Sequence, residues 1–166
     1  MRDASELDDD QLPVVDEVTG LANRRGFLEM LRMEERRQAR YGGSPTLMVV
    51  DGERAVAPLS PAEQPGALLQ IAAVLADATR DTDTLGRVDD YRFALLAIGA
   101  GSTPAAIAGR LRLFLELRGV QAVVTAAPTG SLEQAWRELD GAPRPALRLV
   151  REKTAPAVAD PGPSDG

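Results

Sequence analysis

The stretch that decides the fold lies near the start of the chain, where residues 16–25 read DEVTGLANRR. Short polar residues around a glycine are typical of a turn closed by side-chain hydrogen bonds. Asn23 is a favourable helix N-cap and precedes a long stretch without proline. Asp16 and Asn23 look catalytic in a motif search, but we interpret them as parts of a capped turn. The segment therefore predicts a turn that leads into a helix at residues 24–40.

The predicted helix at residues 24–40 is amphipathic. Phe27, Leu28 and Leu31 fall on one side at helical spacing, and six Arg and three Glu occupy much of the rest. Such an excess of positive charge could serve an anionic partner. A solvated surface on which Glu and Arg neighbours pair is the simpler interpretation and the one that we favour.

Beyond this helix, hydrophobic periodicity and turn residues predict alternating strands and helices. A short apolar run at residues 46–50 is typical of a buried strand, and it ends in Asp51. The later predicted elements are a loop at 57–65, a helix around 68–75, a hairpin of strands 85–88 and 91–98, a helix from Pro104, a strand at 120–125, a helix opened by Ser131 and Gln134 with Trp136 in its core face, and a strand at 146–150. This order describes an α/β sandwich with a mixed, partly antiparallel sheet.

The length of 166 residues fits one domain. We expect it to comprise residues 14–153, between a flexible acidic tail at 1–13 and a disordered tail at 154–166, because neither end can bury enough apolar surface to order itself. The chain contains no Cys and no His. This composition excludes disulfides, thiol nucleophiles, imidazole chemistry and the usual zinc sites, so any metal would have to be held by oxygen.

The net charge of -6 argues against a protein whose main role is to neutralise nucleic-acid phosphates. No apolar run approaches the roughly 20 residues that a membrane helix needs. The first thirty residues also lack the basic start and apolar block of an export signal. We therefore expect a cytoplasmic protein with no nucleic-acid or membrane partner.

Several segments, in order, resemble the GGDEF family of diguanylate cyclase domains. Residues 16–25 resemble the opening signature DxLTGLxNRR, Asp51 ends the next strand as in the family, and residues 87–93, RVDDYRF, fall where RxGGDEF is expected. The resemblance implies a palm of the ferredoxin type with a βααββαβ core. It also implies a reaction in which two such domains face each other and join two GTP molecules into cyclic di-GMP with the help of metal ions.

The positions that match the family's active site are degenerate. Asp51 matches the first metal ligand, but Tyr91 and Arg92 replace the two acids of the motif, and neither side chain supplies negative charge for a divalent cation. Asp89 and Asp90 replace the two glycines, so bulk and negative charge face an anionic substrate. We therefore expect no metal, no cofactor and no catalytic residue here.

Two further features of the family are missing. Residues 54–61 replace the guanine-contacting stretch and lack its Asn and Asp. Leu147 stands where the phosphate-binding Lys is expected, after Pro143 and Pro145 have interrupted the chain. Both losses point away from GTP turnover.

One ligand motif survives, because Arg80 and Asp83 match the family's RxxD product-inhibition motif at its spacing ahead of Asp89. By this resemblance, Arg80 would grip a phosphate or a guanine edge of cyclic di-GMP, and Asp83 would accept from guanine N–H groups. The structural alternative is an arginine that complements a helix dipole and an aspartate that caps a turn.

These observations predict a catalytically inactive GGDEF-like domain that acts as a signalling or protein-interaction scaffold in bacterial nucleotide second-messenger regulation. The expected partner is another protein or a second copy of the chain. The first alternative is a cyclic di-GMP receptor that binds through Arg80 and Asp83. The second alternative is a weak diguanylate cyclase that uses Asp51.

Overall fold

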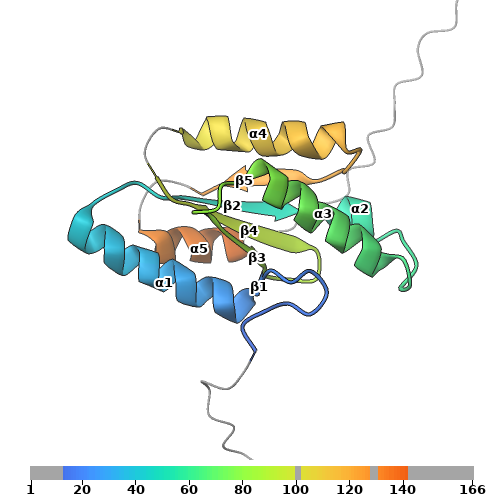
Figure 1. Ribbon diagram of the computed structural model, residues 1–166, viewed down its shortest axis with the longest axis horizontal. Helices are drawn as coiled ribbons and strands as arrows, with labels where there is room; N and C mark the ends of the chain where they lie inside the picture. The colour runs from blue at the N-terminus through green and yellow to red at the C-terminus, as the bar shows by residue number, and fades with distance from the viewer. Residues whose placement is uncertain (1–12, 100–101, 128–130, 142–166) are drawn as a thin grey trace, which may run out of the picture.

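The computed structural model describes residues 13–99, 102–127 and 131–141, in which strands and helices alternate (Figure 1). The elements are β1 (Ala22–Asn23), α1 (Arg24–Tyr41), β2 (Thr46–Asp51), α2 (Glu53–Val56), α3 (Gln64–Ala78), β3 (Thr84–Arg87), β4 (Arg92–Ala97), α4 (Pro104–Leu117), β5 (Val123–Ala126) and α5 (Leu132–Asp140). From β2 to β5 this order is the expected βααββαβ succession. β1 and α1 precede it and α5 follows it.

The strands form one sheet in the order β1-β3-β4-β2-β5. β2 lies antiparallel between β4 and β5, and β3 pairs antiparallel with β4. β1 pairs in parallel with β3. The predicted fold class, a ferredoxin-like palm with a mixed and partly antiparallel sheet, is confirmed.

Side chains alternate across the sheet, so each face buries its own apolar cluster. Met48 and Leu95 lie opposite each other in β2 and β4 and pack with residues of α3 and α4. Leu47 and Leu96, the next opposed pair, pack with residues of α1 and α5. Figure 1 shows the resulting layers, with α3 and α4 on one side of the sheet and α1 and α5 on the other.

The N-terminal signature and α1 form as predicted. Asn23 caps the helix, since its side chain accepts a 2.9 Å hydrogen bond from the Gly26 N–H. Phe27 and Leu31 are buried against the sheet. The Phe27 ring lies 5.6 Å from the Trp136 ring between centroids, so Trp136 belongs to the core, as expected.

The elements differ from the sequence prediction at several points, and the two-residue strand β1 was not predicted. The short helix α2 was not predicted, because four residues are too few for helical periodicity to show. α3 begins at Gln64, so Pro65 lies in its first turn, where a missing N–H loses no hydrogen bond. β5 begins at Val123 rather than at Val120, since only residues 123–126 pair with β2.

Some sequence-based expectations cannot be placed on this fold. The two tails, apart from Pro13, the strand predicted at 146–150, and Pro143, Pro145 and Leu147 lie outside the described residues. Among the described residues, no helix combines the length and hydrophobicity that spanning a membrane requires.

Gly86 tests how closely α1 packs on β3. A Cβ at this position would lie 2.9 Å from the Phe27 Cβ and 3.0 Å from the Ala22 carbonyl oxygen. We expect Gly86→Ala to lower the free energy of unfolding by about 1–3 kcal/mol, because only backbone or a core ring can move to relieve the contact.

Gly109→Ala is the matched control, since nothing lies within 4 Å of a Cβ built at this position of α4. This substitution should raise stability by about 0.5–1 kcal/mol, the usual gain for replacing glycine inside a helix. Urea unfolding measures both variants. Equal stability of the two would contradict the close approach of α1 to β3.

Candidate functional site

The positions that match the family's active site gather at one end of the two central strands. β2 ends in Asp51 and β4 begins at Arg92, and the sheet register places these residues opposite each other. Arg92 Nε donates to Asp51 Oδ2 over 3.1 Å, and the two residues are only 9% and 7% exposed. Asp51 Oδ1 accepts a 3.0 Å hydrogen bond from the Glu53 backbone N–H. Both carboxylate oxygens therefore have a donor from the protein itself.

This arrangement does not fit a divalent cation. Mg²⁺ needs several oxygen ligands in octahedral geometry, and here a guanidinium lies beside the Asp51 carboxylate. Tyr91 adds no ligand, because it packs against the cluster on the α3 and α4 face. In the described part of the chain, no group of three acidic side chains lies close enough together to hold a metal ion.

Asp89 and Asp90 form the turn between β3 and β4, as predicted. Both are exposed. Asp89 Oδ1 accepts a 2.8 Å hydrogen bond from the Asp90 N–H, and the Val88 N–H donates to the Arg92 carbonyl over 2.9 Å. The turn therefore presents two carboxylates at the surface, a few residues from the Asp51–Arg92 pair.

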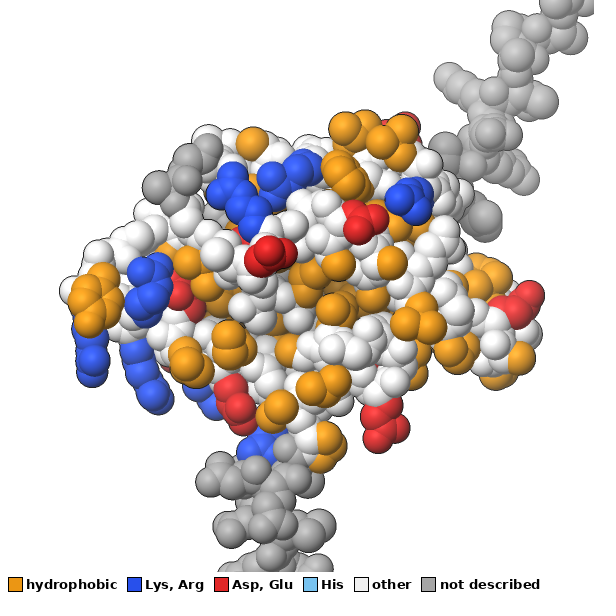
Figure 2. All heavy atoms as spheres, viewed as in Figure 1, with side chains coloured by type: hydrophobic (Ala, Val, Ile, Leu, Met, Phe, Trp, Pro, Cys, Tyr) orange, Lys and Arg blue, Asp and Glu red, His pale blue; other side chains and the backbone are white. Residues whose placement is uncertain are grey.

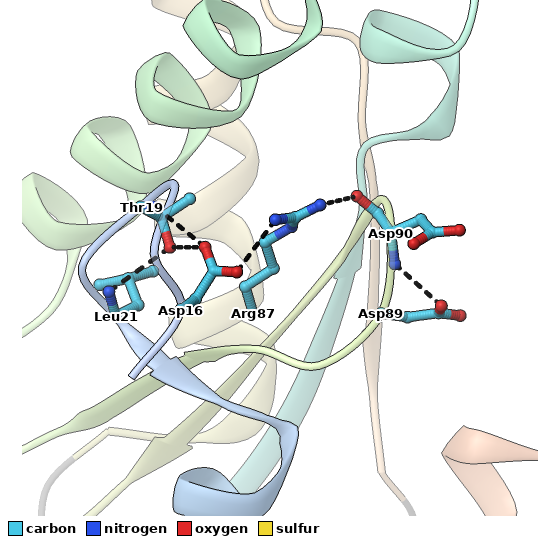
Figure 3. A network of polar contacts seen from close by, with 6 residues as sticks. All are labelled: Asp16, Thr19, Leu21, Arg87, Asp89 and Asp90. Carbon is cyan, nitrogen blue, oxygen red and sulfur yellow. Dashed lines mark hydrogen bonds and ion pairs between the residues drawn. The ribbon is translucent and has the colours of Figure 1, made fainter. Parts of the chain in front are cut away.

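Arg87 ties this turn to the N-terminal signature, and Figure 3 shows the network. Arg87 Nη1 lies 3.0 Å from Asp16 Oδ1, and Nη2 donates to the Asp90 carbonyl over 2.9 Å. Asp16 Oδ2 accepts from the Thr19 hydroxyl at 2.7 Å and from the Thr19 N–H at 2.9 Å. Asp16 thus closes the turn and anchors the hairpin, which agrees with its interpretation as a structural residue.

The surroundings of Asp16 shift its acidity. Burial raises the pKa of the Asp16 carboxyl, but the hydrogen bonds from Thr19 and the positive charge of Arg87 outweigh burial. Together they hold the pKa of Asp16 below its ordinary value. The carboxylate therefore stabilises the folded chain in its ionised form.

Arg80 and Asp83 lie near the other end of β4, away from Arg92. Asp83 Oδ2 accepts a 2.9 Å hydrogen bond from the Arg80 N–H, and Oδ1 accepts a 3.1 Å hydrogen bond from the Ile98 N–H. Asp83 therefore caps the turn after α3 and ties it to the end of β4. This is the turn-capping role that the sequence offered as the structural alternative to ligand binding.

A small cleft opens beside Arg80, and α4 forms its other side. Its lining includes Thr46, Asp83, Ser102 and Arg110. Arg80 Nη2 lies 3.5 Å from Ser102 Oγ, and the buried Nε of Arg110 has no hydrogen-bond partner among the described residues. Neither guanidinium forms an ion pair with a described carboxylate. The cleft, of about 10 Å³, therefore brings two positively charged side chains together beside the carboxylate of Asp83.

Arg110 was not predicted from the sequence as a site residue. It is distant from Arg80 along the chain, and only the packing of α4 beside the end of β4 brings the two into one cleft. A helical projection could have indicated it, because Arg110 lies one turn after the buried Ile107, on the same side of α4.

Comparisons with known proteins give matches only among solved structures. No family model matches the chain, and no curated protein matches it in sequence. A DGC protein from Thermotoga maritima is 26% identical, with a TM-score of 0.62, over 75% of this chain and 97% of that chain. The diguanylate cyclase SiaD from Pseudomonas aeruginosa, solved with its activator SiaC, is 25% identical, with a TM-score of 0.57, over 78% of this chain and 60% of that chain.

A third match has a bound ligand in its structure. The coiled coil and GGDEF domain of DgcB from Caulobacter crescentus, in complex with c-di-GMP, is 16% identical, with a TM-score of 0.62, over 76% of each chain. The chain has the fold of GGDEF domains.

The fold brings some of the predicted site residues together and separates others. Asp51 and Arg92 form a buried pair, and the turn at Asp89 and Asp90 lies close to them along the chain. Tyr91 packs on the other face of the sheet. The Arg80 and Asp83 cleft is near the opposite end of β4 and forms a separate candidate site.

Replacing Asp16 by Asn tests the network of Figure 3. The native pKa of Asp16 is lowered, so the ionised carboxylate contributes its full stabilisation above about pH 4 and loses it as the pH falls through the native value. We expect Asp16→Asn to be less stable than wild type at neutral pH. We also expect the difference to shrink in acid.

Urea unfolding over a pH series measures this dependence. Glu17→Gln removes an exposed neighbouring carboxylate and controls for the change in net charge. A stability difference between wild type and Asp16→Asn that stays constant as the solution is acidified would contradict the role given to the carboxylate.

Proposed function

We propose that this GGDEF-like domain is catalytically inactive and serves as a signalling or protein-interaction scaffold in bacterial nucleotide second-messenger regulation. The buried pair of Asp51 and Arg92 carries the proposal. A carboxylate paired with an internal guanidinium has its charge compensated, so it has little to gain from an added cation. Asp51, which matches a metal ligand of the family, is therefore already paired with a side chain of the protein.

The turn between β3 and β4 supports the same conclusion. In the family, as the resemblance implies, two glycines at this place let the backbone approach a phosphate. Asp89 and Asp90 add Cβ atoms and carboxylates there, and both are exposed to any approaching ligand. Negative charge on the turn disfavours a triphosphate in the same place.

An interaction role fits a domain that keeps the fold without the chemistry. Among the similar structures, the diguanylate cyclase SiaD was solved in complex with its activator SiaC, so a protein of similar fold binds a protein partner there. We propose a protein partner or self-association for this chain and a cytoplasmic location. Its surface would then carry the function.

The inactive assignment predicts that purified protein with GTP and Mg²⁺ forms no cyclic di-GMP, as measured by chromatography. Arg92→Glu tests the reason. Two carboxylates would then lie side by side at the ends of β2 and β4, so the variant should be less stable than wild type. Added Mg²⁺ should raise the melting temperature of Arg92→Glu and leave that of wild type unchanged.

Asp51→Asn is the control for any turnover that is observed. Mg²⁺-dependent conversion of GTP by the wild-type protein that disappears in Asp51→Asn would overturn the proposal and support the weak diguanylate cyclase instead. Conversion that persists in Asp51→Asn would come from another enzyme in the preparation.

A second candidate function is a receptor for cyclic di-GMP, and the Arg80 cleft favours it. Arg80 and Arg110 line one cleft without ion pairs to the described acids. Guanidinium groups bind phosphate and the guanine edge through paired hydrogen bonds. Asp83 keeps lone pairs on both oxygens beyond the two backbone N–H groups that it binds, so it can still accept from a guanine.

Isothermal titration with cyclic di-GMP tests the receptor. We expect a dissociation constant near the micromolar range, about -8 kcal/mol, and binding at least roughly tenfold weaker in Arg80→Ala and in Arg110→Ala. Arg54→Ala removes another arginine that lies outside this cleft and should bind like wild type. Equal affinity of wild type and Arg80→Ala would argue against the receptor.

A further inference from the structure

One side of α1 faces away from both the sheet and α5. Its residues recur at helical spacing over the last three turns, and we call them the α1 flank: Met30, Met33, Arg36, Arg37, Arg40 and Tyr41. Met33 is 59% exposed and Tyr41 is 78% exposed, and Met30 is 42% exposed. Three large apolar side chains thus stand in water beside three arginines. Figure 2 shows hydrophobic and basic side chains together where this end of the helix protrudes.

The positive charge of the flank is only partly neutralised. Arg37 Nε donates to Glu34 Oε2 over 2.7 Å, and the Glu34 side chain is buried beneath it. Arg36 and Arg40 form no ion pair with any described residue. The flank therefore carries two uncompensated positive charges in a protein whose net charge is -6.

The flank is also hollowed. Met33 and Tyr41 line a depression of about 330 Å³ together with the three arginines. Such a volume has room for an apolar side chain of a partner, with the arginines around its rim. Methionine adapts its shape to a partner surface, and tyrosine and arginine are the residues most enriched at binding hot spots.

A solvated helix surface does not account for this combination. On the side of α1 that meets α5, charged side chains form hydrogen bonds between the two helices. Arg24 is hydrogen bonded to Asp140, and Glu35 accepts from the Glu133 N–H. On the flank, exposed Met and Tyr gain nothing from water. Met, Tyr and Arg together are the composition of an interface core.

We propose that the α1 flank binds an acidic, amphipathic segment of a protein partner. Carboxylates of the segment would pair with Arg36 and Arg40, and an apolar side chain would enter the hollow between Met33 and Tyr41. A second copy of this chain joined flank to flank is disfavoured, because both surfaces carry excess positive charge and would repel each other. The inference deepens the proposed scaffold function by naming its surface and the chemistry of its partner.

The test uses the full chain and a synthetic fluorescent peptide, helical, with leucines on one face and glutamates on the other. Fluorescence anisotropy should show binding to wild type that weakens as salt is added. The double variant Arg36→Glu with Arg40→Glu should bind at least roughly tenfold more weakly, and Met33→Ser should also lose affinity. All these positions are exposed, so the variants should melt at the wild-type temperature.

Matched controls lie at the C-terminal end of α4, at Leu117 and at the following residue, Arg118. Arg118→Glu reverses an exposed charge and Leu117→Ser removes a side chain that is 73% exposed, and both should bind the peptide as wild type does. A peptide with glutamines in place of the glutamates should bind less tightly to wild type. The double variant Arg36→Gln with Arg40→Gln removes the two charges without reversing them, so its affinity for the peptide should lie between those of wild type and of the double Glu variant.

Three outcomes would overturn the proposal: no peptide binding by wild type, equal binding by the flank variants, or equal loss in the Leu117 and Arg118 controls. Binding of wild type to anionic phospholipid vesicles but not to the peptide would overturn it in favour of a lipid surface. GTP turnover is measured separately in the same preparations. If the protein converts GTP and also binds the peptide, only the proposal that it is inactive is refuted. If it neither converts GTP nor binds the peptide, only the proposal for the α1 flank is refuted.

Discussion

Strands β2 and β4 lie side by side at the centre of the sheet, and the register between them governs both the core and the candidate site. Every residue of β2 from Thr46 to Asp51 has a partner in β4. A slip of β2 by one residue against β4 would move Met48 to the face that packs with α1 and α5, and Leu47 to the face that packs with α3 and α4. Burial on both faces therefore fixes the register, and the same register sets Asp51 opposite Arg92. The hydrophobic packing of the sheet holds the ion pair in place.

This pairing changes what the end of β2 can do. A nearly buried carboxylate needs a bound cation or a cationic side chain beside it, and here Arg92 is that side chain. Uncompensated positive charge lies elsewhere, at Arg80 and Arg110 near the other end of β4 and at the far end of α1. In the proposed function, the positive charges available to ligands and partners therefore lie away from the positions that match the family's active site.

The sequence allowed much of the fold to be predicted, because local patterns decide it. Asn23 has the chemistry of an N-cap, residues 46–50 form an apolar run, and the acids at 89 and 90 suit a turn. The decisive site contacts join distant residues, so local patterns do not contain them. The sequence showed that Arg92 replaces an acid of the motif. It did not show that Arg92 pairs with Asp51, because that contact depends on the register of β2 and β4. Arg110 was not predicted as a site residue, because only tertiary packing brings it beside Arg80. The helix α2 was not predicted, because four residues are too few for helical periodicity to show.

The central claim is that Arg92 and Asp51 stabilise each other inside the fold, and a double-mutant cycle measures that directly. Urea unfolding of wild type, Asp51→Ala, Arg92→Ala and the double variant gives the coupling free energy of the two side chains. We predict a favourable coupling of about 1–3 kcal/mol, since each single variant leaves a nearly buried charge without its partner. Single-variant effects that add to within about 0.3–0.5 kcal/mol would show that the two groups act independently and would contradict the account.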